Sequence, residues 1–289
     1  MKILGTGLNG LIGSRITELL DNKYEFENIS RSTGVDIVNY ESVLNAISSS
    51  DSKIVLHTAA HTDVKVAEKE KDLREESQCW KINVVGTQNV AKACSETGKK
   101  LIHVSTDMVI GGDNMPENGF GEDAQYNPLS FYAITKAQAE KVVQNLSTPW
   151  LIMRTAYPYR ASFVKPDFVR FFKEWLFSGK KISVLEDRII SPTFIDDLAK
   201  ALDALIEKDA SGIYNTVGSQ ILSVYDAVIL VAKAFNLDTN LVSKTTRKQF
   251  LVGRPPEPFS SALNNDKIRE LGVEMNTLTQ GLEIIKTQI

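Results

Sequence analysis

Residues 1–13 read MKILGTGLNGLIG, and this stretch decides the fold class. A short apolar strand at residues 2–4 leads through a turn into a helix, which the pattern predicts from about Leu11 to Leu20. Three glycines recur at three-residue intervals: Gly7, Gly10 and Gly13. Glycines at this spacing allow a tight turn, a close approach of pyrophosphate to the backbone, and close packing of helix on strand. The stretch therefore predicts a dinucleotide-binding turn, with the N–H groups at the start of the helix facing the phosphates.

Strands and helices alternate through the first half of the chain, which predicts a parallel sheet covered by helices on both faces. The expected strands are continuous apolar runs, as buried parallel strands are, at residues 24–29, 53–57, 100–105 and 150–155. Helices are expected around residues 74–97 and 130–145. We predict an α/β fold, a Rossmann-type doubly wound parallel sheet with a smaller C-terminal mixed α/β substrate-binding region. The predicted domains are residues 1–155 and 156–289, and the chain is free to cross between them.

Composition and charge exclude several classes of protein. The 289 residues are 43% hydrophobic and 24% charged, which suits one large or two closely joined globular domains. A formal net charge of -3 gives no general affinity for nucleic acid or for an anionic membrane surface. No apolar run is long enough to cross a bilayer, and Cys79 and Cys94 are expected as buried thiols inside helices. We therefore expect a soluble, cytoplasmic protein without nucleic-acid or membrane partners.

The end of the second strand indicates which nicotinamide cofactor the site takes. An NAD site usually has a carboxylate there for the ribose hydroxyls, whereas this chain reads ISRS at residues 29–32. Arg31 offers a bidentate cationic partner to a 2′-phosphate, so NADPH is favoured and NADH is the alternative. Asp36 and Ile37 follow, and we expect them at the edge of the adenine.

A tyrosine and a lysine four residues apart, Tyr132 and Lys136, lie in the stretch NPLSFYAITKAQAEK. On a helix this spacing places the phenol and the ammonium on the same face, one turn apart. A nearby cation stabilises a phenolate, so the pair predicts a phenol whose pKa is lowered from its usual value of about 10. Such pairs are common on solvated helix faces, but the dinucleotide turn upstream favours a catalytic acid and its partner.

The strand expected at residues 100–105 ends in two hydroxyls and an acid, Ser105, Thr106 and Asp107. Ligands of an open parallel sheet lie beyond the carboxyl ends of the strands, so we expect these side chains near the substrate. Together with the glycine turn and the Tyr-Lys pair, the stretches HTAAHTDV, INVVGTQN and VSTD make the chain resemble the extended short-chain dehydrogenases. RTAYPY, SPTFIDDLA, GIYNTVGSQ and a late RPP segment narrow the resemblance to the dTDP-4-dehydrorhamnose reductase family, over nearly the full chain.

The resemblance implies a reaction and a set of site residues. The reaction is NADPH-dependent reduction of the 4-keto group of a nucleotide-linked 6-deoxy sugar, dTDP-4-dehydro-L-rhamnose to dTDP-L-rhamnose. Tyr132 would donate a proton to the C4 oxygen, Lys136 would hold the ribose hydroxyls, and Thr106 would orient the carbonyl. The residues expected to bind the cofactor are Gly7, Gly10, Leu11, Ile12, Gly13, Arg31, Asp36, Ile37, Ala59, Ala60, His61, Tyr132 and Lys136. The residues expected to face the sugar are Thr106, Asp107 and Tyr157. Asn83 would brace the helix or a water near the site.

The chain departs from the family pattern at several positions. The departures are Lys65 for an acid, Met108 for an aromatic residue, Ala133 for a glycine, Tyr157 for a tryptophan, Arg188 for a glutamine and Ile190 for a glycine. Since they cluster on the sugar side, the sequence determines the cofactor chemistry better than the identity of the sugar.

Other activities stay open at this point. A nucleotide-sugar epimerase uses the same tyrosine and lysine with an NAD that is never released, and regulatory subunits of methionine adenosyltransferase resemble this family but bind a partner enzyme. A 4,6-dehydratase is disfavoured, because that family has an acid pair after the threonine and here Met108 follows Asp107. No metal site is expected, because His57, His61 and His103 are not spaced as ligands on one element. A homodimer is left open.

Overall fold

The computed structural model describes all 289 residues, and the chain folds into two compact units. The first unit comprises residues 1–109, 128–154 and 205–214, and the second comprises residues 110–127, 155–204 and 215–289. Compared with the division expected after residue 155, residues 110–127 fall in the second unit, where Gly112 bridges to Ser260 and Phe120 to Leu263. Residues 205–214 fall in the first unit, because they lead into its last strand.

A six-stranded sheet forms the centre of the first unit, with the strand order β2-β1-β3-β4-β5-β8. Its strands are β1 (Lys2–Thr6), β2 (Glu25–Ile29), β3 (Ile54–His57), β4 (Lys100–Thr106), β5 (Trp150–Thr155) and β8 (Gly212–Asn215). β1 pairs in parallel with β2 and with β3, and β3 pairs in parallel with β4. The predicted Rossmann-type α/β fold is confirmed. The strand order changes direction between β1 and β3, which is where open sheets of this kind bind ligands.

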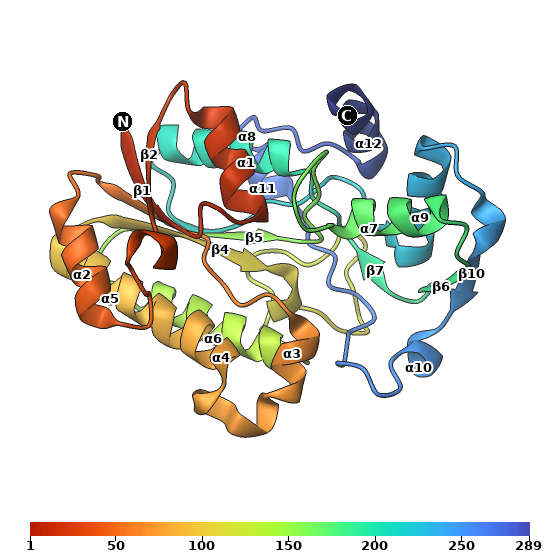
Figure 1. Ribbon diagram of the computed structural model, residues 1–289, viewed down its shortest axis with the longest axis horizontal. Helices are drawn as coiled ribbons and strands as arrows, with labels where there is room; N and C mark the ends of the chain where they lie inside the picture. The colour runs from red at the N-terminus through yellow and green to blue at the C-terminus, as the bar shows by residue number, and fades with distance from the viewer. The chain divides into compact units, whose positions relative to one another are not determined.

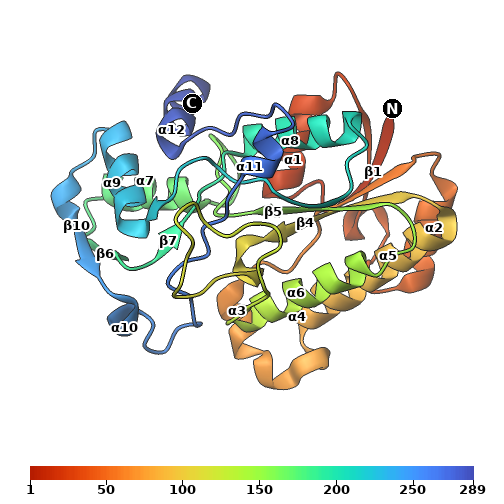
Figure 2. The same ribbon diagram turned by 180° about the vertical axis from the view of Figure 1, so that it is seen from behind.

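Helices cover both faces of this sheet (Figure 1). α1 (Leu11–Leu20) lies on one face, and α2 (Tyr40–Ser49), α5 (Gly86–Thr97) and α6 (Phe131–Gln144) lie on the other, as the reverse view also shows (Figure 2). Shorter elements are α3 (Val64–Lys69), α4 (Gln78–Trp80) and the 3-10 helices Arg31–Thr33, Lys71–Glu76 and Asp107–Val109. Apolar side chains of the sheet and of α2 and α5 form one buried core, which includes Leu4, Val43, Val55, Val90 and Leu101.

The single helix expected around residues 74–97 is wrong. Arg74 has φ 48° and ψ −119°, and this conformation interrupts the helical backbone. Ser77 then caps a new helix start with its side chain. The helical backbone continues through a π-helical turn at Lys81–Val85 into α5. Asn83 lies in that turn, and π-helical turns are frequent at functional sites.

The second unit is built around two small sheets. β6 (Ile182–Leu185) pairs in parallel with β10 (Val242–Thr245), and β7 (Ile189–Ile190) pairs antiparallel with β9 (Leu222–Ser223). Its helices are α7 (Phe168–Phe177), α8 (Ile195–Glu207), α9 (Val224–Ala234), α10 (Arg247–Phe250), α11 (Asp266–Arg269) and α12 (Leu278–Gln288). The last turn of α8 belongs to the first unit. A short 3-10 helix spans Thr239–Leu241. The core of this unit is a separate cluster that includes Tyr159, Val169, Val228 and Leu282.

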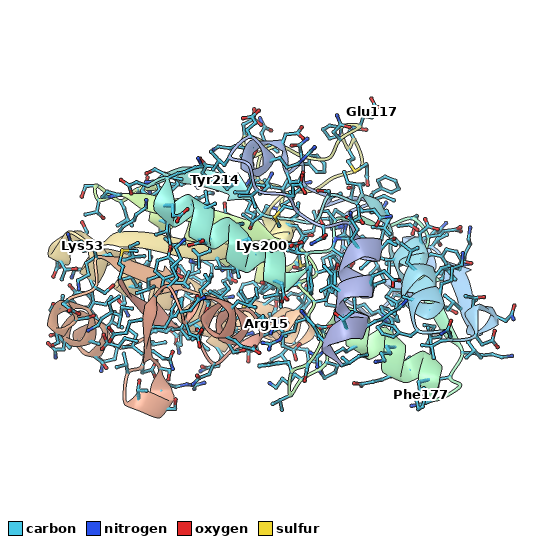
Figure 3. All side chains as sticks on the ribbon, turned by 90° about the horizontal axis from the view of Figure 1, so that it is seen from above. Arg15, Lys53, Glu117, Phe177, Lys200 and Tyr214 are labelled. Atoms are coloured by element: carbon cyan, nitrogen blue, oxygen red, sulfur yellow. The ribbon has the colours of Figure 1, made fainter.

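One face of α7 stays apolar and open. Phe171 and Trp175 are partly exposed, and Phe177, at the end of the helix, is 82% exposed (Figure 3). None of the helices combines the length and the apolar character needed to span a membrane.

Candidate active site

The turn after β1 leaves no room for side chains. Gly7 has φ 71°, and a Cβ on it would lie 2.6 Å from the backbone N of Ala59. A Cβ on Gly13 would lie 2.6 Å from Leu8 Cα, so α1 packs directly on the turn. Gly10 is the N-cap of α1 and has no side chain to accept from the first N–H groups of the helix. The positive end of the helix dipole at this N-terminus favours an anionic group.

The other residues predicted to line a cofactor lie on both sides of this turn. Leu11 and Ile12 begin α1 and are half-buried. Ala59, Ala60 and His61 follow β3, the neighbour of β1, and are half-buried as well. The structure therefore gathers them at the carboxyl ends of β1 and β3, and their contact with a cofactor stays a prediction.

Three residues beyond β2 differ in how far they could reach a nucleotide. Arg31 is exposed in the 3-10 turn that follows the strand. Asp36 is exposed, and its carboxylate accepts a hydrogen bond from the Val38 N–H. Ile37 is buried in the core beside Gly86, where a Cβ would lie 2.7 Å from Ile37 Cδ1. Arg31 is thus open to a ligand, whereas Ile37 serves chiefly in packing.

Tyr132 lies in the first turn of α6, and its phenol reaches the end of β4. Ser130 is the N-cap of α6, where its side chain accepts from the Ala133 N–H and fixes the start of the helix. The phenol lies close to Thr106 and Asp107, and the Thr106 hydroxyl donates to Asp107 Oδ1 over 3.1 Å. Tyr132 is only 8% exposed. A phenol, a hydroxyl and a carboxylate therefore meet at the carboxyl end of a central strand.

A small apolar cluster surrounds the Tyr132 ring. It consists of Ala67, Cys79, Phe131 and Tyr132, with Val64, Trp80 and Met108 packed at its edge. Met108, which stands where the family has an aromatic residue, thus packs against the cluster that contains Tyr132. The departure from the family pattern is local to the reacting group.

The prediction that the pKa of Tyr132 is lowered is wrong for the free protein. Burial raises the pKa of this phenol above its usual value, and the carboxylate of Asp107 raises it further. The neighbouring Thr106 hydroxyl lowers the pKa and so acts in the opposite direction. A phenol with a raised pKa is protonated at neutral pH, so it holds the proton that a general acid donates, but it is a weaker acid than a free phenol.

Lys136 is 2% exposed, and its ammonium is buried against β4. Nζ donates to the carbonyl of Val104 over 2.9 Å and lies 3.1 Å from His103 Nε2. Burial lowers the pKa of Lys136 to about 8, and Glu140, one turn further along α6, acts in the opposite direction. The side chain is therefore charged at neutral pH and close to losing its proton.

Asn83 joins the loop after β3 to the helix that carries Tyr132. Its Oδ1 accepts from the His61 N–H over 2.7 Å, and its Nδ2 donates to the His61 carbonyl over 3.1 Å. The same Nδ2 donates to Thr135 Oγ1 over 3.0 Å, and Thr135 donates to the carbonyl of Tyr132. Asn83 therefore braces α6 directly through protein atoms.

Two of the sugar-side departures lie together in the second unit. Tyr157 has φ 44°, in the left-handed region, and the Arg188 guanidinium carbon lies 6.0 Å from its ring centroid. Arg188 is buried, and it donates to Glu257 over 3.2 Å and to Ser261 over 2.6 Å. Since the guanidinium is occupied by protein partners, its first effect is to hold this part of the second unit. That Tyr157 faces the sugar stays a prediction.

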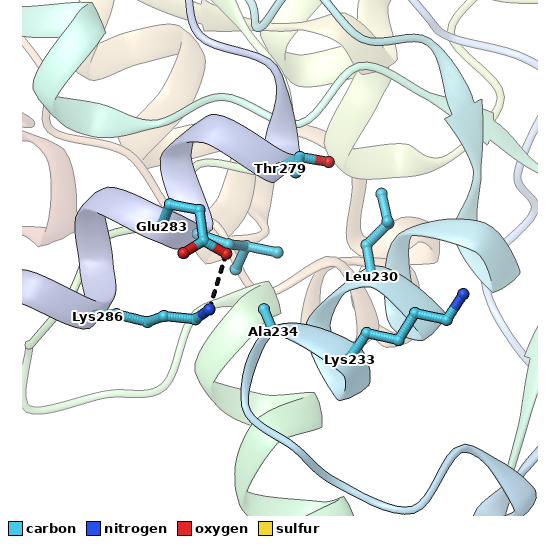
Figure 4. Close-up of a pocket in the computed structure, with 7 residues that line it drawn as sticks. Leu230, Lys233, Ala234, Thr279, Glu283 and Lys286 are labelled. Atoms are coloured by element: carbon cyan, nitrogen blue, oxygen red, sulfur yellow. Dashed lines mark hydrogen bonds and ion pairs between the residues drawn. The ribbon is translucent and has the colours of Figure 1, made fainter.

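A small pocket of the second unit is separate from these residues. It lies between α9 and α12 and has a volume of about 180 Å³ (Figure 4). Lys286 and Glu283 form an ion pair of 2.7 Å at its wall. None of the residues predicted for cofactor or sugar binding lines it.

Comparison with known proteins gives the family. The profile of the family described as RmlD substrate binding domain matches residues 1–288. The chain belongs to this family. It is 32% identical to the dTDP-4-dehydrorhamnose reductase of Escherichia coli over 243 residues, which covers 80% of this chain and 77% of that protein. It is 25% identical over 290 residues to methionine adenosyltransferase 2 subunit beta of Xenopus tropicalis, covering 96% of this chain and 84% of that one.

A solved structure of the same family matches along the whole chain. The dTDP-4-dehydrorhamnose reductase of Bacillus anthracis, crystallised in complex with NADP, has a TM-score of 0.89 and 28% identity. The match covers 100% of this chain and 99% of that one. These comparisons confirm the predicted family and fold, and with them the predicted oxidoreductase class.

The polar residues beneath the site were not predicted from the sequence. The strand histidines were considered only as metal ligands, yet His103 contacts Lys136. A signal was present, because β1, β3 and β4 bear Thr6, His57 and His103 at matching positions, where buried strands are otherwise apolar. The two cysteines are buried and free, as predicted.

Proposed function

We propose that the protein uses NADPH to reduce the 4-keto group of a nucleotide-linked 6-deoxy sugar, with dTDP-4-dehydro-L-rhamnose as the favoured substrate. The observation that carries the proposal is the position of the buried Tyr132 in the first turn of α6, near Thr106 and Asp107, with the buried, charged Lys136 one turn further along the helix. The NADP complex of the Bacillus anthracis relative supports NADPH as the cofactor. The two free, buried thiols agree with a reducing compartment, so we place the reaction in the cytoplasm.

The turn after β1 fits a dinucleotide. Side chains are excluded from it at Gly7 and Gly13, and the N–H groups at the start of α1 lack a side-chain cap. Arg31, exposed beyond β2, would hold a 2′-phosphate, and Lys136 would hold the ribose hydroxyls. When bound, the cofactor supplies the hydride that reduces the carbonyl carbon.

The residues at the end of β4 and the start of α6 would supply the proton, orient the carbonyl and stabilise the phenolate that is left. Tyr132 would donate its phenolic proton to the carbonyl oxygen as negative charge develops there, and the raised pKa keeps that proton in place beforehand. Thr106 would turn its hydroxyl to the same oxygen and orient the carbonyl. The charged Lys136 would stabilise the phenolate that Tyr132 becomes, until solvent returns the proton.

The decisive experiment removes the phenolic hydroxyl. Tyr132→Phe should lower NADPH oxidation with a dTDP-4-keto-6-deoxy sugar by about 10²- to 10⁴-fold, the usual contribution of a positioned acid. NADPH affinity, measured by fluorescence, should be nearly unchanged. Tyr159→Phe is the matched control, because Tyr159 is also buried and its hydroxyl has no hydrogen-bond partner. Equal turnover by Tyr132→Phe and the parent would overturn the mechanism.

One other function is favoured by a specific observation, the similarity to methionine adenosyltransferase 2 subunit beta. A non-catalytic subunit of that kind would bind NADPH but would not oxidise it with any nucleotide sugar. A panel of nucleotide sugars followed by NADPH absorbance separates the two functions. Protein purified with stoichiometric NAD that does not exchange would instead indicate an epimerase.

A further inference from the structure

Two buried histidines lie side by side beneath the candidate active site. His57 of β3 and His103 of β4 are direct partners in the parallel register, and their ring centroids are 5.2 Å apart. Thr6 of β1 is the register partner of His57 on the other side. The three side chains thus form a polar row across the middle of the sheet, and each is at most 1% exposed.

The hydrogen bonds of His57 determine its tautomer. Thr87 donates its one hydroxyl proton to the carbonyl of Asn83 over 2.7 Å, so it can only accept from His57 Nε2, 3.0 Å away. Nε2 therefore carries the proton, and Nδ1 accepts from the Thr6 hydroxyl over 2.6 Å. His57 has both nitrogens satisfied as a neutral ring, and protonation would place two donors against the Thr6 hydroxyl and the Thr87 oxygen. The His57 ring is therefore uncharged and is held in place beside His103.

The neighbouring His103 has the opposite tautomer. The ammonium of Lys136 has only N–H donors, so His103 Nε2, 3.1 Å from Nζ, is the acceptor and Nδ1 carries the proton. His103 Nδ1 is buried without a hydrogen-bond partner. An unpartnered buried donor costs stability, because its hydrogen bond to water is lost and not replaced. The ring thus keeps its Lys136 contact although the opposite nitrogen is left unsatisfied.

We infer that His103 is a positioning residue for the reaction: its Nε2 accepts from Lys136 and holds the ammonium in place, one turn along α6 from Tyr132. The inference rests on the proposed function for its kinetic consequence, but the contact itself does not depend on it. Val104 O holds a second N–H of the same ammonium, which leaves the third for a ligand. His103 and Val104 O together therefore fix both the place and the orientation of the Lys136 ammonium.

Charged and titratable groups around Lys136 are consistent with this role. Burial lowers the pKa of His57 to about 3, and burial together with Lys136 lowers the pKa of His103 well below its usual value. Both imidazole rings are therefore uncharged throughout the working pH range. Glu140 from α6 and Cys79 from α4 both raise the pKa of Lys136, against the effect of burial.

Three substitutions test the inference. His103→Leu removes the acceptor, and His103→Asn keeps a polar group that is too short to replace Nε2. His103→Gln can place its Oε1 near the position of Nε2 and should rescue the contact. We expect kcat to fall about ten- to a hundredfold in the first two variants, the range for a lost hydrogen bond to a charged group, and to recover to within a few-fold in the third.

The pH profile provides a readout that a purely structural role would not move. Loss of the acceptor destabilises the charged form of Lys136, so the alkaline limb of kcat/KM should move to lower pH in His103→Leu and His103→Asn. The limb should stay in place in His103→Gln. If all three variants lose activity alike and keep the parent profile, the positioning role is overturned.

A measurement without substrate separates this inference from the proposed function. Nitrogen NMR of the imidazoles should show His57 protonated at Nε2 and His103 at Nδ1 at pH 7. Carbon NMR of ε-labelled lysine, with Lys136→Arg for assignment, should show a lower pKa of Lys136 in His103→Leu than in His103→Gln and the parent. These results would support the contact even if no sugar is turned over, and an unchanged Lys136 titration would refute it.

Discussion

Glu140 of α6 and Arg154 of β5 form an ion pair in the interior of the first unit. Arg154 Nη2 donates to Glu140 Oε2 over 2.8 Å, and Nε donates to Oε1 over 3.1 Å. Both side chains are at most 1% exposed. Glu140 lies one helical turn after Lys136, so the pair ties the helix with Tyr132 and Lys136 to the next strand of the sheet.

Glu140→Gln should therefore destabilise the protein strongly. The change removes the carboxylate that faces a buried guanidinium, and breaking a buried ion pair typically costs about 3–5 kcal/mol. Denaturant unfolding of parent and variant at pH 7 measures the difference. Glu283→Gln is the control, because it breaks an exposed pair with Lys286 and should cost less than about 1 kcal/mol. Equal losses in the two variants would contradict the assignment.

Gly7→Ala should damage the cofactor turn more than its backbone conformation alone explains. The φ of Gly98 is 66°, which is similar to the 71° of Gly7, but a Cβ on Gly98 would meet nothing within 4 Å. Gly98→Ala thus measures the cost of left-handed backbone, about 1–2 kcal/mol. Gly7→Ala adds a clash with the backbone of Ala59, and it should also weaken NADPH binding at least tenfold, measured by fluorescence titration. An affinity equal to that of Gly98→Ala would argue against a phosphate at this turn.

Arg31→Ala tests the predicted contact with the 2′-phosphate. An exposed arginine that binds this phosphate by charge-assisted hydrogen bonds should contribute to NADPH and not to NADH. We expect kcat/KM for NADPH to fall about ten- to a hundredfold, with the value for NADH unchanged. Arg269→Ala, at another exposed arginine, should leave both values at the parent level. Parallel losses with the two cofactors would place the role of Arg31 elsewhere.

The sequence predicts most of the first unit because its strands are apolar runs and its turns have clear residue types. The helix predicted from Leu11 to Leu20 has those bounds, and the Tyr132–Lys136 pair lies on a helix as its spacing requires. The interruption at Arg74 could not be predicted in this way, because it depends on a left-handed residue that no local pattern marks. The helix Tyr40–Ser49, capped by Asn39, was not identified either.

The candidate site shows a second limit of sequence reasoning. Spacing along a helix predicts that Lys136 lies one turn from Tyr132, but it does not predict which other groups surround each of them. The pKa of Tyr132 is raised by its burial and by Asp107, and the ammonium of Lys136 is held by His103 of β4. These contacts follow from the parallel register of β3 and β4 and from how α6 packs on the sheet. Only the three-dimensional structure gives them.

The neutral His57 should make the stability of the protein depend on pH. The pKa of His57 is about 3 in the folded protein because of burial, whereas a histidine in the unfolded chain has a pKa of about 6.5. Between these values the unfolded chain binds the proton and the folded protein does not, so stability falls as the pH drops from about 6.5 toward 3. Each such histidine contributes up to about 1.4 kcal/mol per pH unit to this slope.

His57→Gln should reduce the pH dependence of the unfolding free energy by up to about 1.4 kcal/mol per pH unit, whatever it does to stability at neutral pH. Denaturant unfolding at pH 7, 6 and 5 gives the slopes of parent and variant. If the slope of His57→Gln equals that of the parent, then His57 is protonated in the folded protein, and the tautomer derived from Thr6 and Thr87 is wrong.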